Sequence, residues 1–281
     1  MQKTLIAKDS SERVNHANRR LNDLKTFLDS YIRTEPISTR LEYERNKVQH
    51  YFKLESPPPV EISLLTGEVI ASLRSALEYQ AVHIAGYLND KPLLENEEKQ
   101  LLFPLFRNRK DFDHKFSKMQ KRSPQLHKRW TAIVKKVQPF ARASSFWKNE
   151  FGAQTHKAEH LDFQRFIQNT LIRMFELSNH DKHRRLQPTW FVPNLFLSSG
   201  SEESSSWKIH KWKPNDGDLV ATMSGKFDLN GKLPMSEIQF GLYLPNSNIH
   251  MEVFGDLDEM KYATEYMLKF LNFEFEKKVK V

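Results

Sequence analysis

Seven consecutive residues, 179–185, bring together the side chains of this chain that are best suited to acid–base chemistry. An imidazole can transfer a proton near neutral pH, and a guanidinium group can stabilise negative charge that develops on a phosphate. The cluster therefore indicates chemistry on a phosphate ester, with four candidate catalytic residues: His180, Asp181, His183 and Arg184. The alternative is a helix end at which His and Arg interact with the helix dipole and the last carbonyls.

Two further candidate catalytic residues, Arg74 and Glu78, lie four positions apart in the segment 60–88. On a helix this spacing places both side chains on one flank, next to the apolar positions Ile70, Leu77 and Ala81. One interpretation is an arginine that points into a cleft and holds a phosphate. The other is an internal ion pair that fixes helix packing, because buried charges must be paired.

Most of the positive charge of the chain lies in one segment. The formal net charge is +8, and residues 101–140 contain 11 Lys and Arg but only 2 Asp and Glu. Cationic side chains neutralise phosphates, and the interleaved Phe106, Phe112, Phe116 and Trp130 can stack on unpaired bases. The segment therefore predicts binding of RNA or another polyanion; a solvated helix face whose aromatic residues belong to the core is the alternative. The candidate nucleic-acid contacts are Arg122, Lys128, Arg129, Lys135 and Lys136.

Other classes of chemistry find little support in the sequence. The chain has no Cys, which excludes a disulfide scaffold, a thiol nucleophile and a thiolate-bound metal. Only 9 Gly are present, which argues against a nucleotide-binding fold built on Gly-rich loops. His156 and His160 are four apart and could share a metal with Glu176, His180 and His183, but a spacing typical of a third ligand is missing. We therefore expect neither a metal nor a cofactor.

The elements that must position these residues are mainly helical in the first two thirds of the chain. Apolar positions three and four apart predict helices over 10–31, 60–88, 124–138 and 161–177. Residues 40–54 look extended, and Phe103–Phe106 reads as a short aromatic anchor rather than a helix. Strand patterns then recur at 190–197, 207–212, 219–229, 236–244 and 249–254, with a hairpin turn at Asn230–Gly231 and a last helix over 257–275.

These elements define an α+β fold with two expected parts. Residues 1–186 form a mainly helical domain, an N-terminal helical bundle that contains the short extended segment 40–54. Residues 187–281 form a small antiparallel β region followed by the C-terminal helix, packed on the first domain. The first helix carries an apolar stripe at alternating spacings of three and four, which suits packing on its own bundle or a seam with a second copy of the chain. The stripe consists of Val14, Ala17, Leu21, Leu24, Leu28 and Tyr31.

Three blocks of the sequence resemble a widespread group of uncharacterised bacterial proteins. They are LTGEVIASLRSALEYQAVHIA (Leu65 to Ala85), LLFPLF (Leu101 to Phe106) followed by the basic stretch and VQPF (Val137 to Phe140), and LIRMFELSNHDKHRRL (Leu171 to Leu186). The group typically reads Arg-Ser-Ala-Leu-Asp-His in the first block and Asp-Lys-His-Arg in the last. In this chain Glu78 replaces the Asp, and Tyr79 stands where the His is common. The resemblance covers roughly residues 10–190.

The group's usual Arg-Ser-Ala-Leu-Asp-His looks like the motif of HEPN-type helical domains, an Arg followed four to six residues later by a His. The resemblance implies a helical bundle, and many such domains are metal-independent ribonucleases of toxin–antitoxin and phage-defence systems that act as dimers. In such an enzyme the 2′-hydroxyl of the RNA attacks the adjacent phosphate. His180 or His183 would transfer the proton, and Arg184 and Arg74 would stabilise the charge. Tyr79 departs from the motif.

The sequence therefore predicts a cytoplasmic RNA-binding or metal-independent RNA-cleaving protein of a bacterial defence or toxin-like system. The N-terminus has no apolar signal-peptide core, and the longest uncharged stretch, 186–201, is too short to span a bilayer, so no membrane contact is expected. The alternative is a non-catalytic adaptor or structural protein in which Arg74, Glu78, Asp181 and Arg184 form an internal ion-pair network. The expected partners are RNA or another polyanion, a second copy of the chain, or a protein encoded in the same operon.

Overall fold

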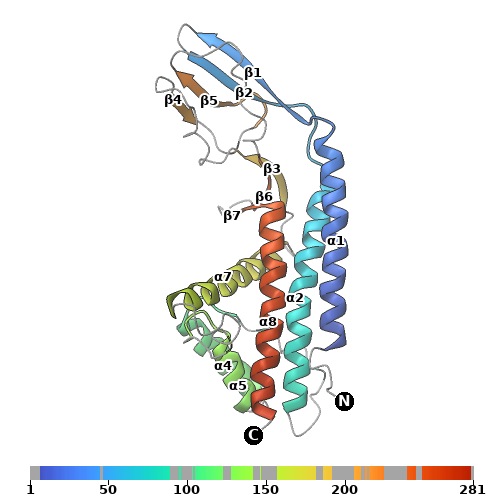
Figure 1. Ribbon diagram of the computed structural model, residues 1–281, viewed down its shortest axis with the longest axis vertical. Helices are drawn as coiled ribbons and strands as arrows, with labels where there is room; N and C mark the ends of the chain where they lie inside the picture. The colour runs from blue at the N-terminus through green and yellow to red at the C-terminus, as the bar shows by residue number, and fades with distance from the viewer. Residues whose placement is uncertain are drawn as a thin grey trace. The chain divides into compact units, whose positions relative to one another are not determined.

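The protein is described by a computed structural model, shown in Figure 1. The structure describes residues 7–44, 47–88, 95, 103, 105–122, 128–141, 146, 157–181, 186–191, 206–209, 213, 215–224, 239–244 and 249–279. The fold is α+β and mainly helical, with antiparallel sheets and a C-terminal helix, as the sequence predicts. In the described part of the chain, no helix is long and apolar enough to cross a membrane.

Among the helices that the structure describes from end to end, all but one follow the predicted segments closely. Their bounds are α1 (Lys8–Ile32), α2 (Val60–Leu88), α4 (Arg109–Arg122), α5 (Lys128–Lys136), α7 (Lys157–Asp181) and α8 (Val253–Val279). Helix α2 starts directly after Pro57–Pro59, because proline restricts its predecessor and cannot donate to a helix interior. Helix α4 is the exception, since no helix was predicted between the aromatic anchor and residue 124. Phe103, Leu105 and Phe106 are non-helical, as predicted.

The strands form two antiparallel sheets. Their bounds are β1 (Ile37–Glu44), β2 (Lys47–Leu54), β3 (Gln187–Phe191), β4 (Ser206–Ile209), β5 (Leu219–Ser224), β6 (Gln239–Leu244) and β7 (Ile249–Glu252). One sheet has the order β1-β2-β5-β4 and the other has the order β3-β6-β7. In β2, Val48, His50 and Phe52 are buried, and this period of two is typical of a strand with one face in the core. The predicted turn at Asn230–Gly231 lies outside the described residues.

The chain divides into two compact units that are each built from separate segments. The first unit contains residues 1–20, 68–182 and 257–281, and the second contains 21–67 and 183–256. The predicted division was a single boundary between residues 186 and 187. The difference arises because β2, in the early extended segment, pairs with β5, with Tyr51 opposite Leu219. Residues 37–54 therefore belong with the later strands and not with a helical domain 1–186.

In the first unit, α1, α2 and α8 lie side by side (Figure 1). Gln80 of α2 is fully buried, and both ends of its amide have partners. Its Oε1 accepts a hydrogen bond from the Ala7 amide at 2.9 Å, and its Nε2 donates to Asn272 Oδ1 at 2.8 Å. Helix α2 buries apolar residues on most of its circumference, as a central helix must. The apolar stripe of α1 is buried within the single chain. A stripe that is already buried has no face for a seam with a second copy, so the bundle interpretation of this stripe is confirmed.

In the second unit, a turn at residues 215–218 fixes the start of β5. The Asp218 amide donates to the Asn215 carbonyl at 3.1 Å, and Gly217 adopts a φ of 79°, a left-handed conformation that glycine adopts without steric cost. The Gly217 amide donates to the Phe52 carbonyl at 2.8 Å, which ties the turn to β2. In the same unit, Ser63 Oγ donates to the Leu186 carbonyl at 2.7 Å and so holds the residue that directly follows the 179–185 cluster.

Candidate nucleic-acid interface

The first and last resemblance blocks meet in the first unit, through Arg74 of α2 and the last turns of α7. The Arg74 guanidinium donates from Nε to Glu78 Oε1 at 2.9 Å and from Nη1 to Asn179 Oδ1 at 2.5 Å. Nη1 also donates to Ser178 Oγ at 3.3 Å. One arginine therefore joins two helices through residues that are 104 and 105 positions away from it in sequence.

The surroundings of Arg74 are those of a structural residue. Only 8% of its surface is exposed, and its guanidinium lies over the Phe175 ring at 4.8 Å from the ring centre. A planar guanidinium combines such a stacked contact with several donated hydrogen bonds, which is why arginine is preferred at partly buried sites of this kind. The predicted ion pair between Arg74 and Glu78 is present. The Nε and Nη1 atoms of Arg74 donate to protein groups, namely Glu78, Ser178 and Asn179.

The other candidate catalytic residues are placed only in part. His180 and Asp181 belong to the last turn of α7, and the structure gives no position for their side chains. His183 and Arg184 lie outside the described residues. Of the six candidates, the structure therefore brings together Arg74 and Glu78, with Ser178 and Asn179 as partners; Asn179 begins the 179–185 cluster, although neither partner is among the candidate catalytic residues.

Helix α4 gives the basic segment a defined geometry. Each residue turns a helix by about 100°, so the residues at 110, 114, 118 and 121 fall within about 80° of one another. All four are exposed cationic or titratable side chains, and we call them the α4 stripe: Lys110, His114, Lys118 and Lys121. In the described part of the chain, no carboxylate pairs with a side chain of this stripe. The stripe extends about 16 Å along the axis, at about 1.5 Å per residue.

The aromatic residues of α4 lie on the opposite side of the helix. Phe112 and Phe116 are buried and stack on each other at 4.9 Å between ring centres, and Phe140 contacts Phe112 at 5.8 Å. Trp130 of α5 is fully buried as well. The prediction that these rings stack on unpaired bases is therefore wrong for Phe112, Phe116 and Trp130. They are core residues, because α4 needs an apolar face to pack on the unit.

The acidic residues near α4 have local partners of their own. Asn108 caps the helix: its Oδ1 accepts from the Asp111 amide at 2.9 Å, and its Nδ2 donates to Asp111 Oδ2 at 2.8 Å. Asp113 lies 3.7 Å from Arg109. Arg107, just before the helix, forms two hydrogen bonds with Glu176, and these bonds raise the pKa of Arg107 above its ordinary value. None of these described carboxylates is paired with a stripe side chain, although Asp111 and Asp113 each lie three residues along the helix from a member of the stripe.

The two adjacent lysines at the end of α5 differ in role. Lys135 is exposed, as expected for a nucleic-acid contact. Lys136 Nζ lies 2.5 Å from Oε2 of Glu274, a residue of α8 whose side chain is only 1% exposed. Lys136 is therefore tied to an internal carboxylate, which the sequence alone does not reveal. Arg122 belongs to α4, and Lys128 and Arg129 belong to α5, but the structure gives no position for these three side chains.

The α4 stripe was missed at the level of sequence, although a signal for it exists. Phe112 and Phe116 are four apart, and Asn108 precedes Asp111 by three, the spacing of an N-cap with a reciprocal partner. Together they indicate a helix over this segment, and on a helix the four residues of the stripe fall on one face. Among the described residues, no group of three or more His, Asp or Glu side chains could hold a metal ion. His156 lies outside the described residues.

Comparison of the chain with protein-family models, with curated proteins and with solved structures gives no match. The resemblance to HEPN-type domains therefore stays a prediction.

Proposed function

We propose that this chain binds RNA through the α4 stripe and holds it without cleaving it. The observation that carries the proposal is the separation of faces on α4, with Lys110, His114, Lys118 and Lys121 exposed on one side and Phe112 buried on the other. Exposed cations in a row neutralise successive phosphates, and the release of counterions makes such binding favourable at low salt. RNA is proposed over other polyanions because the bacterial group that the first and last blocks resemble usually has a first block like the motif of HEPN-type domains, many of which act on RNA.

The contacts of Arg74 favour binding over cleavage. A catalytic arginine must present donors to the reacting phosphate, whereas Nε and Nη1 of Arg74 donate to Glu78, Ser178 and Asn179. These contacts support the non-catalytic alternative, because Arg74 joins α2 to Ser178 and Asn179 of α7. By the same resemblance, the RNA is bound in the context of a bacterial defence or toxin-like system.

The binding surface is tested with a variant that removes three charges of the stripe. Fluorescence anisotropy with a labelled 20-nucleotide single-stranded RNA in about 100 mM salt measures the affinity. Three lost phosphate contacts are expected to weaken binding about 10- to 100-fold, from the counterion term of each contact. The stripe variant carries Lys110→Gln, Lys118→Gln and Lys121→Gln.

A matched control removes the same charge elsewhere, from exposed residues after α1, on β2 and on α8. If binding depends on net charge alone, both variants lose affinity equally, and the proposal of a localised interface fails. The control variant is expected to keep its affinity within about threefold, because none of its three charges belongs to the α4 stripe. It carries Arg33→Gln, Lys47→Gln and Lys269→Gln.

Cleavage is tested in the same preparation with a chelator present. We expect the RNA to stay intact over hours while it is bound. RNA cleavage that disappears in a His180→Ala or His183→Ala variant would overturn the non-catalytic part of the proposal and favour the HEPN-type enzyme.

A further inference from the structure

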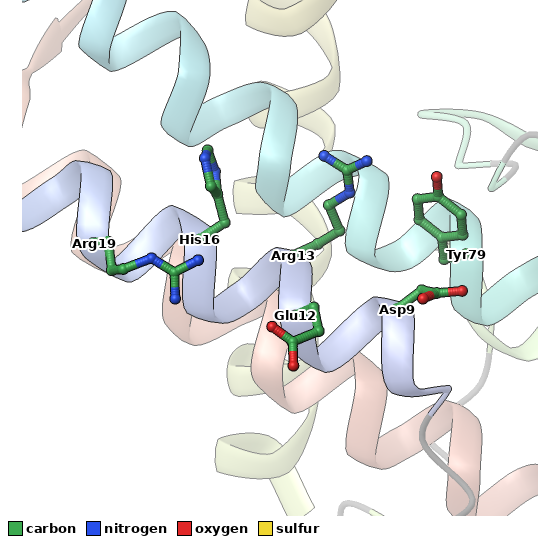
Figure 2. A pocket seen from close by; sticks show the side chains of 6 residues that line it. All are labelled: Asp9, Glu12, Arg13, His16, Arg19 and Tyr79. Atoms are coloured by element: carbon green, nitrogen blue, oxygen red, sulfur yellow. The ribbon is translucent and has the colours of Figure 1, made fainter.

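A hollow of about 300 Å³ lies along the first half of α1, away from the residues used above, and is shown in Figure 2. Its lining from α1 recurs at spacings of three and four, which places these side chains on one face of the helix. Tyr79 of α2 completes it. The volume is at the lower end of the range of small-ligand pockets, roughly 300–1,000 Å³. The lining residues are Asp9, Glu12, Arg13, His16, Arg19 and Tyr79.

Two of these side chains are held in place by α2. His16 Nδ1 lies 3.0 Å from Ser72 Oγ, and the Arg13 guanidinium lies over the Tyr79 ring at 5.4 Å from its centre. Figure 2 shows Arg13 and His16 both directed toward α2. Side chains that are fixed before a ligand arrives lose less entropy on binding, so these two groups are pre-organised to hold one.

The arginines of the hollow differ from the next arginine of α1 in whether they form an ion pair. The next arginine of α1, Arg20, is bound to Glu68 at 2.9 Å. In contrast, Arg13 and Arg19 form no ion pair with any carboxylate in the described part of the chain. Residues three apart on a helix are neighbours, so Arg13 and His16 can contact the same anionic group. With Nδ1 at Ser72, the Nε2 atom of His16 is the ring nitrogen that can serve a ligand.

We propose that this hollow binds the 5′-phosphate of a ribonucleotide. Arg13 and His16 contact the phosphate, because a guanidinium donates two parallel hydrogen bonds to phosphate oxygens. Arg19 adds a second guanidinium group to the lining of the hollow. Asp9 and Glu12 accept hydrogen bonds from the ribose hydroxyls, and they oppose binding of a bare phosphate that has no donors to offer. The proposal is independent of the α4 stripe, since none of its residues lies on α4.

A ribonucleotide 5′-phosphate occurs both in a free nucleoside monophosphate and at the 5′ end of an RNA. Isothermal titration of the full chain with AMP, and with a short RNA that carries either a 5′-phosphate or a 5′-hydroxyl, separates them. Binding of AMP identifies the free nucleotide, and tighter binding of the phosphorylated RNA alone identifies the RNA end. If neither occurs, or if inorganic phosphate binds as tightly as both, the proposal is overturned.

The variants test the named contacts. Arg13→Gln is expected to lower the affinity for the phosphorylated probe at least tenfold. Arg13→Lys restores only part of it, because an ammonium lacks the fork geometry. Ser72→Ala is expected to lower the affinity several-fold by releasing the His16 ring, and Arg33→Gln serves as the control beyond the end of α1. An Arg13→Gln chain that binds as well as the unaltered chain would contradict the assignment.

The stripe variant of α4 distinguishes this proposal from the proposed function. It should bind AMP or the phosphorylated end normally while losing affinity for the 20-nucleotide RNA. The proposal for the α4 stripe and the proposal for the hollow can therefore be refuted separately in this pair of experiments.

Discussion

Replacement of Arg74 by Met tests whether the α2–α7 network is structural. The substitution keeps most of the apolar stem but removes three donated hydrogen bonds, to Glu78, Ser178 and Asn179. Loss of one partner from a buried ion pair typically costs about 3–5 kcal/mol, because the other charge stays buried. Here the side chain of Arg74 is 9% exposed and that of Glu78 is 26% exposed, so water can reach Glu78 in the variant. We therefore expect a loss of about 2–4 kcal/mol in the free energy of unfolding.

Urea unfolding followed by circular dichroism measures this loss in the full chain. The control is Arg165→Met, on α7, where the side chain is 65% exposed and lies 3.6 Å from Asp162. Exposed pairs of this kind contribute about 0–1 kcal/mol, so the control should unfold almost as the unaltered chain does. The double variant Arg74→Met/Glu78→Leu is expected to recover about 1 kcal/mol or more, because it removes the carboxylate that Arg74→Met leaves without its partner.

RNA affinity provides the second measurement on the same variant. If Arg74 is structural, Arg74→Met changes the affinity by less than about twofold at temperatures where the variant is folded. An unchanged unfolding free energy together with a large loss of RNA binding or cleavage would refute the structural interpretation. It would show that the guanidinium acts on the ligand.

Two further predictions concern stability. Lys136→Met is expected to destabilise the chain by about 2–4 kcal/mol, because Glu274 loses its cation. Lys135→Met, the control, should cost less than about 0.5 kcal/mol. Equal effects of the two substitutions in urea unfolding would contradict a structural role for the Lys136–Glu274 pair. The buried His50 has its pKa lowered from 6.5 to about 4 by desolvation, so the unfolded chain binds a proton more readily between these values. The free energy of unfolding should therefore fall as the pH drops from 6.5 to 4, by at most about 3 kcal/mol. A His50→Gln chain should lack the part of this pH dependence that His50 contributes. Identical pH profiles of the two chains would contradict this contribution of His50.

Local patterns in the sequence predict much of the fold. Helix α2 begins and ends where Pro57–Pro59 and the polar residues after Leu88 place it, because helix termination depends on nearby residues. The Arg74–Glu78 pair is likewise local, since residues four apart on a helix are neighbours. The buried stripe of α1 follows from its spacing alone.

Such local patterns do not predict contacts between segments that are distant in sequence. Nothing near Arg74 indicates Asn179, which is 105 residues away, and nothing near Lys136 indicates Glu274. The pairing of β2 with β5 similarly joins strands that lie more than 160 residues apart, and the division into two units depends on it. Helix α4 was missed for a different reason: its apolar face consists of only two spaced Phe residues within a strongly charged segment.

Binding of RNA by the α4 stripe is tested most directly by the salt dependence of the affinity. For single strands, the logarithm of the affinity falls with the logarithm of the salt concentration by about 0.7 per neutralised phosphate. Loss of Lys110, Lys118 and Lys121 should therefore make the slope shallower by about 2, while the Arg33, Lys47 and Lys269 control keeps the slope of the unaltered chain. Equal slopes in the stripe variant and the unaltered chain would mean that these three lysines do not contact phosphates, and would contradict the proposed interface.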